Sequence, residues 1–545
     1  MESDEGAKPL LSWLEPLEDG SQRPNRVRWL FDSQCGLSGH LLPRWIFLRA
    51  LGAIYFSAFL SLLFQIKGLI GSRGVLPAHD YLAALSRIAH GVMRLWYAPS
   101  LFWISSGDGM LMWVTWIGII ASLLVLLNIW PRLNLAICFV CFLSFVCVAQ
   151  DFSSYQSDGM LLEAGLLALF LAPRGLRPGL GASSPPMRAA YLLLVWEWFR
   201  IYFESGMVKW LSGDPEWRHF TAMDDYYQNL PLPSWIGWYV SHLPHWFHVA
   251  TAVSTLVMEF LLVLMVFFPR RVRIICFFIV TPWQIGVIVT ANYAFLNYLV
   301  LCLGFLLLDD RFLRSLLPSK LFLQNAMNAS VQDRNRIVRI MRDAGIVVSA
   351  VVMCWIGYAT ATEMIGMVVP SSPLPQWPVR VLEPFRIANQ YGLFAVMTRG
   401  RYEIEFQGSD DGEHWTAYPF RFKPQSINEA PGIYAPYQPR FEWNLWFASL
   451  GDWQQNQWVA LTEERLLEND DSVLALFRSN PFAQHPPKYV QAVLWQYWFT
   501  SMQQKRNTGN WWRRDSLGRY APMLTRDSEG KFSVAQPADD LPPHD

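Results

Sequence analysis

Residues Trp45–Ile66 read WIFLRALGAIYFSAFLSLLFQI, and this stretch decides the fold class. About 20 mostly apolar residues in a row are enough to cross the hydrocarbon core of a bilayer as a helix. Eight further stretches have a similar character: Met110–Trp130, Leu133–Ala149, Met160–Ala172, Ala190–Trp210, Val249–Phe268, Ile274–Thr290, Phe295–Leu308 and Ile346–Val369. Met160–Ala172 and Phe295–Leu308 are short enough to be half-helices or partly buried segments instead. The pattern predicts a membrane α-helical bundle of about nine spans.

The overall composition agrees with a polytopic membrane protein. Of the 545 residues, 52% are hydrophobic and 16% are charged, whereas an ordinary soluble domain has roughly 25% charged residues. The 44 basic and 44 acidic side chains cancel, which argues against a nucleic-acid partner bound by a basic face. The sequence has no Walker loop, no dinucleotide-binding glycine motif and no nucleophile elbow, so it indicates no cofactor.

Basic residues near the span ends predict the orientation, because Lys and Arg are retained on the cytoplasmic side. They gather in segments that would share one side of the membrane: Arg174–Arg188, Arg270–Arg273 and Arg311–Arg342. Gln150–Gly159 and Ala291–Ala294 contain none. With nine spans, the N-terminus is then cytoplasmic and everything after Val369 is exported. No apolar run begins near Met1, so we expect the first span to serve as the signal anchor.

The far side is the lumen of the endoplasmic reticulum in a eukaryote or the periplasm in a bacterium. We therefore expect an integral, multi-pass protein of the endoplasmic reticulum membrane or of the bacterial inner membrane.

The composition changes sharply after the ninth predicted span. Four prolines between Pro370 and Pro378 form a stiff linker, and the chain beyond it resembles a water-soluble domain. The predicted organisation is a cytoplasmic segment (1–44), a membrane domain (45–369), a linker (370–384), an exported β-rich α+β domain (385–525) and a disordered tail (526–545).

The pattern within the exported domain predicts its elements. Arg401–Gln407 alternates polar and apolar residues as a strand does, and Asp410-Asp411-Gly412 supplies a turn. We expect Trp415–Phe422 to be the returning strand of a hairpin. The remaining elements are expected to be short helices at Phe441–Leu450, Glu463–Asn469 and Ser472–Arg478, and a strand at Val490–Thr500.

Several charged side chains lie inside predicted spans, where each costs about 2.5–3.5 kcal/mol on insertion scales. Glu197, Arg200 and Glu204 in the fifth span share one helical face, and Lys209 follows. Further polar residues lie where spans meet the exported side: Asp151, Tyr155, Gln156, Asp158, Glu163, Asp214, Trp217, Arg218 and Asn292. Their convergence predicts a polar, water-accessible cavity that opens outward beneath the soluble domain. The alternative is a buried salt-bridge network that only fixes helix packing.

Three histidines spaced by three residues, His242, His245 and His248, raise the question of a metal site. Pro244 interrupts any helix there, and no cysteine or carboxylate lies at a recognisable ligand spacing. We therefore expect no metal, and we interpret these histidines as part of an aromatic belt at the level of the lipid headgroups.

Short motifs recur in order along most of the chain. They are LIGSRG at Leu69–Gly74, Leu76–Ala78, SYQSD at Ser154–Asp158, Leu161–Glu163, SGMVK at Ser205–Lys209, GDPEWR at Gly213–Arg218, Asn292–Tyr293, NQYG at Asn389–Gly392, Gln407–Ser409, PYQPR at Pro436–Arg440, Asn480–Phe482 and WWRR at Trp511–Arg514. In these motifs, from about Trp45 to Leu524, the chain resembles the lipase maturation factor family of polytopic membrane proteins. One segment departs from the family pattern: Tyr226–Pro231 reads YYQNLP where the family usually has a His-Tyr-Glu-Thr-Gln-Pro-like segment, which leaves the client specificity open.

The resemblance implies a protein that helps secreted or exported lipases to fold, assemble and mature. Animal members sit in the endoplasmic reticulum membrane, and their exported C-terminal domain is where the client is thought to bind. The implied partners are membrane lipid and client lipases. The ten tryptophans between Pro370 and Asp545 are expected mostly to form the core of that domain, although they could also present an apolar surface to a client.

A second resemblance is to the transmembrane part of vitamin K-dependent γ-carboxylases. Gly206-Met207-Val208-Lys209 stands where those enzymes have a Gly-Leu-Lys-Lys-like segment with a lysine base. A desolvated lysine can accept a proton in catalysis. The alternative function is thus a carboxylase-like membrane enzyme that uses Lys209 in an outward-facing cavity, with Glu204, Asp158 and Glu163 nearby. A pairing of Lys209 with Glu204, or snorkelling to the interface, is the plainer interpretation, and we expect a maturation factor rather than an enzyme.

Overall fold

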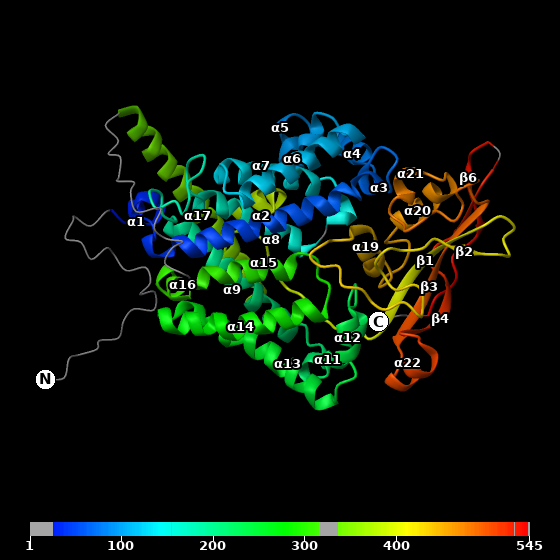
Figure 1. Cartoon of the computed structure of the whole chain (residues 1–545). Coiled ribbons are helices and arrows are strands. Elements are labelled where there is room, and N and C mark those ends of the chain that lie inside the picture. The colour runs from blue at the N-terminus through cyan, green and yellow to red at the C-terminus, as the bar shows by residue number, and fades with distance from the viewer. Residues whose placement is uncertain (1–24, 154, 317–335, 528, 543–545) are drawn as a thin grey trace.

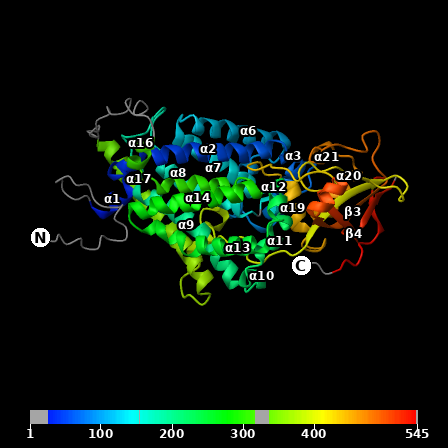
Figure 2. The ribbon, with the colours of Figure 1, turned by 60° about the horizontal axis from the view of Figure 1, so that its bottom comes forward.

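The computed structural model describes residues 25–153, 155–316, 336–527 and 529–542. An elongated helical bundle carries a β-sheet domain at one end, and α1 (Arg26–Phe31) and the beginning of α17 lie at the other end (Figure 1). A view turned by 60° shows the same two-part arrangement (Figure 2).

Each of the nine predicted spans contains a helix. These helices are α2 (Leu41–Leu63), α6 (Asp108–Leu126), α7 (Pro131–Val146), α8 (Gln156–Leu171), α9 (Arg188–Leu211), α13 (His245–Phe260), α14 (Arg270–Thr290), α15 (Leu296–Gly304) and α17 (Arg336–Val368). Among the described residues, five helical segments are long and apolar enough to cross a membrane: Ser38–Leu63, Asp108–Leu126, His245–Phe267, Arg270–Thr290 and Arg339–Val368. The other predicted spans are either shorter, such as α7, or contain several charges, as α9 does.

Shorter helices connect the long ones. They are α3 (Ile66–Ile70), α4 (Ala78–Ile88), α5 (Val92–Tyr97), α10 (Pro215–Arg218), α11 (Ala222–Asn229), α12 (Trp235–Val240) and α16 (Asp310–Leu316). A last one, α18 (Trp377–Leu382), lies in the segment predicted to be a linker.

Small residues allow the long helices to approach closely. A Cβ added to Gly118 on α6 would lie 2.4 Å from a ring carbon of Phe59 on α2, and one added to Gly52 would lie 2.9 Å from the Leu126 nitrogen. Membrane helices commonly use such residues, because van der Waals packing drives their association. Helix α9 packs against α8, α13, α15 and α17, so its charged residues lie inside the bundle.

The C-terminal domain is built on an antiparallel sheet. Its strands are β1 (Arg401–Ser409), β2 (Thr416–Ala417), β3 (Tyr489–Phe499), β4 (Trp512–Arg519), β5 (Met523–Arg526) and β6 (Phe532–Gln536). The order is β2-β1-β3-β5-β6, and β4 also pairs with β3. The domain's helices are α19 (Arg440–Ala448), α20 (Trp458–Leu467), α21 (Asp471–Leu474) and α22 (Met502–Thr508).

Two predictions for this domain are wrong. The returning strand expected at Trp415–Phe422 is reduced to the two residues of β2, because Pro419 has no N–H with which to continue the ladder. The tail expected to be disordered contains β6, which forms an antiparallel hairpin with β5 and thereby satisfies its backbone hydrogen bonds. By contrast, the strands predicted at Arg401–Gln407 and Val490–Thr500 are confirmed as β1 and β3, within one or two residues.

Candidate functional site

Many of the polar residues singled out in the sequence contact the C-terminal domain or the segment that leads into it. Arg200 on α9 forms a buried ion pair with Glu163 on α8. The other guanidinium nitrogen of Arg200 donates to the backbone oxygen of Asn389 at 2.6 Å and lies 4.0 Å from Glu204. Glu163 also accepts hydrogen bonds from the Tyr391 hydroxyl at 2.9 Å and from the backbone and side-chain nitrogens of Asn389, both at 3.2 Å.

The segment Asn389–Gly392 therefore occupies the place where the sequence predicts an open polar cavity. Glu204 accepts a hydrogen bond from the Tyr391 nitrogen at 2.6 Å. The Gln156 amide bonds both backbone groups of Gly392, at 3.0 and 3.1 Å. Side chains of α8 and α9 thus satisfy backbone groups that lie just before the sheet domain, and the arrangement matches the alternative of a packed salt-bridge network.

Glu197 lies in the same layer of the bundle and is fully buried. Neither of its carboxylate oxygens has a hydrogen-bond partner among the described residues. Burying a polar group in this way costs free energy, and nothing else in the site explains its presence.

A second ion pair joins the bundle to the domain. Arg440, at the start of α19, donates to both carboxylate oxygens of Asp158 and to the Phe152 oxygen. The Tyr155 hydroxyl donates to Asn444 on α19 at 2.8 Å, and Asn444 in turn donates to the Asp151 oxygen at 2.7 Å. Tyr155 and Asp158 therefore hold α19 against the beginning of α8.

Lys209 lies at the end of α9, and its partner differs from the one predicted. Its ammonium group contacts both oxygens of Glu259 on α13, at 2.8 and 3.0 Å, instead of Glu204. It also lies 5.2 Å from the centre of the Trp217 ring. Glu259 was missed in the sequence, although a single carboxylate within an apolar span is a signal that could have identified it.

The remaining predicted residues have structural partners or lie apart. Asp214 caps α10 and accepts a hydrogen bond from the Met397 nitrogen at 2.7 Å. Asn292 accepts one from the Tyr434 nitrogen at 2.8 Å, and it donates to the Gly432 oxygen at 2.9 Å. Arg218 is exposed and does not join the network.

Two cavities lie beside this network. The first, of about 280 Å³, is lined by Lys209, Glu259 and Asn297 among mainly aromatic and aliphatic side chains. The second, of about 410 Å³, is lined by Tyr155, Gln156, Val396, Met397, Trp443 and Phe447 among others. Phe394 and the hydrogen-bonded pair Tyr226–Tyr293, whose hydroxyls are 2.9 Å apart, line both cavities and separate them.

The histidines do not converge on a common point. His242 lies 3.0 Å from the Thr500 oxygen, His245 faces Asp224 and His248 lies 3.1 Å from the Leu243 oxygen. Within the part of the chain that the structure describes, no group of three or more His, Cys, Asp or Glu side chains is placed to hold a metal ion.

Comparison with known proteins gives matches over both parts of the chain. Residues 42–315 match a family model described as the lipase maturation factor transmembrane domain, and residues 387–522 match one described as the lipase maturation factor C-terminal domain. Lipase maturation factor 1 of Bos taurus is 31% identical, over 91% of this chain and 91% of its own length. Lipase maturation factor 2 of Gallus gallus is 31% identical over 89% of this chain and 81% of its own length. No solved structure matches.

Proposed function

The chain belongs to the lipase maturation factor family, and we propose on this basis that it is an integral membrane protein required for the maturation of exported lipases. The observation that carries this proposal is the match of both parts of the chain, in the same order, to relatives named for that function. Its clients are lipases that must fold and assemble on the exported side of the membrane.

The comparisons do not support the alternative of a carboxylase-like enzyme. The relatives that match are named as maturation factors, and the ammonium group of Lys209 is paired with Glu259. We assign this ion pair a role in positioning α9 against α13.

The polar network has a docking role in this proposal. Asp158, Glu163 and Glu204 of the bundle bind Arg440 and the Asn389–Gly392 segment. The C-terminal domain, about 385–525, is thereby held as a rigid platform above the membrane domain, about 45–369. A fixed platform can present a client-binding surface at low entropic cost, because few groups have to become ordered on binding.

The client surface in this proposal lies at the mouth of the second cavity. Val396 and Phe447 line this cavity and are 67% and 47% exposed. Four of the nine tryptophans between residues 385 and 525 are buried and are not available for such contacts: Trp443, Trp446, Trp458 and Trp512. Exposed apolar side chains beside a pocket are typical of protein-binding sites.

The proposed topology has nine membrane-crossing helices, a cytoplasmic N-terminus and an exported C-terminal domain. The membrane would be that of the endoplasmic reticulum in a eukaryote, or the inner membrane in a bacterium. Supporting this, Arg174 follows the end of α8, and Arg270 and Arg271 begin α14. Arg200 and Lys209 of α9 meet oppositely charged partners inside the bundle, which lowers the cost of burying them.

Secretion of a lipase tests the function directly. In cells that lack their own maturation factor, expression of this chain is expected to raise the activity of a secreted lipase, measured per amount of secreted lipase antigen. Phe447→Glu and Val396→Glu should lose most of this effect at equal membrane levels, whereas Val534→Glu, an exposed position on β6, should keep it. An unchanged lipase activity with the wild-type chain present in the membrane would refute the proposal.

Glycosylation tests the orientation in a eukaryotic cell. His414→Asn creates the acceptor sequence Asn-Trp-Thr in an exposed turn of the sheet domain, and Ala182→Asn creates Asn-Ser-Ser in the loop between α8 and α9. Both are made in an Asn328→Gln background, because Asn328-Ala329-Ser330 is a native acceptor sequence. We expect a glycosidase-sensitive mass shift for His414→Asn only, and the reverse result would invert the topology.

A further inference from the structure

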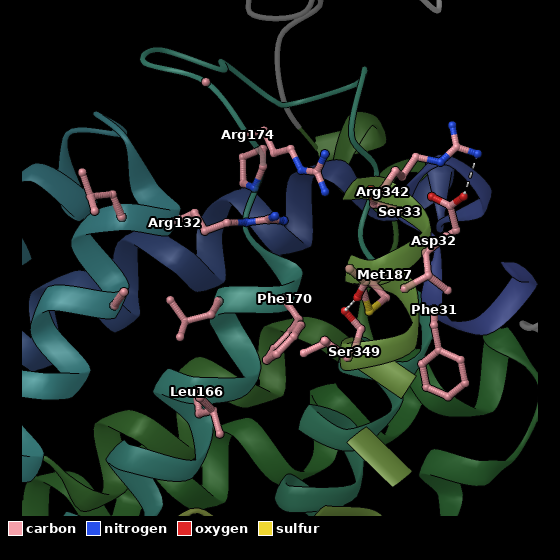
Figure 3. A pocket seen from close by; sticks show the side chains of 18 of the residues that line it. Phe31, Asp32, Ser33, Arg132, Leu166, Phe170, Arg174, Met187, Arg342 and Ser349 are labelled. Carbon is pink, nitrogen blue, oxygen red and sulfur yellow. Dashed lines mark hydrogen bonds and ion pairs between the residues drawn. The ribbon is translucent and has the colours of Figure 1, made fainter. Parts of the chain in front are cut away.

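A groove of about 840 Å³ opens at the end of the bundle that lies opposite the sheet domain. Side chains of α7 and α8 form one wall and those of α17 form the other (Figure 3). The loop around Arg174 borders the upper end of the groove, and the segment Phe31–Ser33 runs along its right side (Figure 3).

Three arginines line the upper part of this groove: Arg132, Arg174 and Arg342. Arg342 pairs with Asp32 at 3.4 Å. Arg132 donates to the Ala172 oxygen at 2.8 Å, but its buried Nε atom has no hydrogen-bond partner. Among the described residues, no carboxylate forms an ion pair with Arg132 or Arg174. The groove therefore has an excess of positive charge.

A further arginine increases this excess. Arg44 is fully buried below the same loop and donates to backbone oxygens, among them those of Leu171 and Ser184. Carbonyl groups do not neutralise its charge. A positively charged site that is partly shielded from water favours the binding of an anion. The planar guanidinium group of arginine can form two hydrogen bonds to the oxygens of a phosphate.

The walls below the arginines are apolar. They are formed by Leu133, Ala136, Leu166, Leu169, Phe170, Ile346 and Val348. Leu166 and Phe170 lie below Arg132 and Arg174 in the close view (Figure 3). A soluble anion would leave this part of the groove unused, whereas a molecule with an anionic head and a hydrocarbon chain would fill both parts.

The groove lies at the level where the bundle ends. Helix α7 begins at Pro131, α8 ends at Leu171 and the apolar span of α17 begins at Arg339. Trp130, at the rim, is 52% exposed, as is typical of an aromatic residue at the headgroup level. The arginines thus lie near lipid headgroups, and the apolar walls lie at the depth of acyl chains.

We propose that this groove binds an anionic glycerophospholipid of the adjacent leaflet, with its phosphate between Arg132 and Arg174 and an acyl chain along Leu166 and Phe170. Basic pockets between membrane helices are suited to such headgroups. The site is separate from the client surface, so it would anchor the bundle in a leaflet that contains anionic lipid.

Native mass spectrometry of the full chain tests this proposal. The detergent-solubilised protein is mixed with equal amounts of phosphatidylglycerol and phosphatidylcholine, and we expect phosphatidylglycerol to be retained preferentially. Arg132→Gln with Arg174→Gln should reduce the retention about fivefold per arginine, as expected for a basic side chain near an anionic lipid. Arg177→Gln is the control, because this exposed arginine of the same loop does not line the groove.

A second pair of variants tests the apolar part without altering a charge. Gly345 on α17 lines the groove, and a Cβ added there would have no atom within 4 Å. The phenyl ring of Gly345→Phe can therefore enter the groove and should block the acyl chain. Gly366 on the same helix is equally unobstructed but lies outside the groove, so Gly366→Phe should bind lipid normally. Excess glycerol 3-phosphate should not displace the lipid.

Three results would overturn the proposal. The first is an undiminished preference for phosphatidylglycerol in the double arginine variant. The second is normal binding by Gly345→Phe. The third is displacement by glycerol 3-phosphate, which would indicate a site for a soluble phosphate ester only.

Discussion

Arg440 on α19 and Asp158 on α8 are 282 residues apart in the sequence and form a two-point ion pair, with N–O distances of 2.7 and 2.8 Å. Both side chains are essentially inaccessible to solvent. The pair joins the two halves of the protein at a place where neither charge can be hydrated. Each charge is therefore stabilised mainly by its partner.

Removal of one partner of this pair is expected to lower the stability of the protein strongly. Arg440→Gln leaves the Asp158 carboxylate buried without its counter-charge, which costs about 3–5 kcal/mol in other buried pairs. The thermal unfolding midpoint of the purified protein should fall strongly. Arg478→Gln breaks the exposed pair with Glu429 and should change the stability by about 0–1 kcal/mol. Equal effects of the two variants would mean that the buried pair does not couple the domains.

Gly159 should be intolerant of a methyl group. A Cβ at this position would lie 2.6 Å from the Asn389 side-chain oxygen, so Gly159→Ala must displace the segment that binds Glu163. We expect a loss of about 1–3 kcal/mol in unfolding free energy. Gly109→Ala, in the first turn of α6, meets no atom within 4 Å and should be neutral or slightly stabilising. Similar unfolding midpoints for the two variants would contradict the tight docking of Asn389.

The Lys209–Glu259 pair should be replaceable as a unit. Lys209→Met alone leaves the buried Glu259 carboxylate without its counter-charge. It should therefore lower both the stability of the protein and the secretion of active lipase. Lys209→Met combined with Glu259→Leu should recover most of both, because apolar replacements of a buried ion pair are often well tolerated. A double variant that regains its stability but not its lipase secretion would show that Lys209 does more than position helices.

Glu442 on α19 should make the C-terminal domain sensitive to pH. Burial raises the pKa of this carboxyl to about 7, even though it accepts hydrogen bonds from the nitrogens of Arg421, Phe422 and Lys423. In the unfolded chain the pKa of a glutamate is about 4.3. The folded state therefore binds the proton more tightly, and the associated stability is present below about pH 4.3 and is lost as the pH rises towards 7.

The measurement is the unfolding midpoint of the wild type and of Glu442→Gln between pH 5 and pH 8. The wild type should lose up to roughly 3 kcal/mol more than the variant over this range, because glutamine does not titrate. Parallel curves for the two proteins would show that Glu442 does not contribute to the pH dependence.

Local patterns in the sequence were sufficient for much of the architecture. Runs such as Trp45–Ile66 predicted membrane helices, and the alternation in Arg401–Gln407 predicted β1, because helix and strand formation depend on neighbouring residues. The ordered motifs between Leu69 and Arg514 led to the correct family. The β2 prediction failed where a single proline ended the pairing.

The partners of the polar residues were decided only by the tertiary structure. The sequence brought Glu197, Arg200 and Glu204 together on one helical face, but it contained no indication that Asn389–Gly392 would bind Arg200 and Glu204. Likewise, the sequence suggested that Lys209 pairs with Glu204, five residues away, or snorkels to the interface, whereas it pairs with Glu259 on another helix. A buried charge is stabilised by whichever counter-charge the packing of distant helices places beside it, and residue spacing along one helix carries no information about that packing.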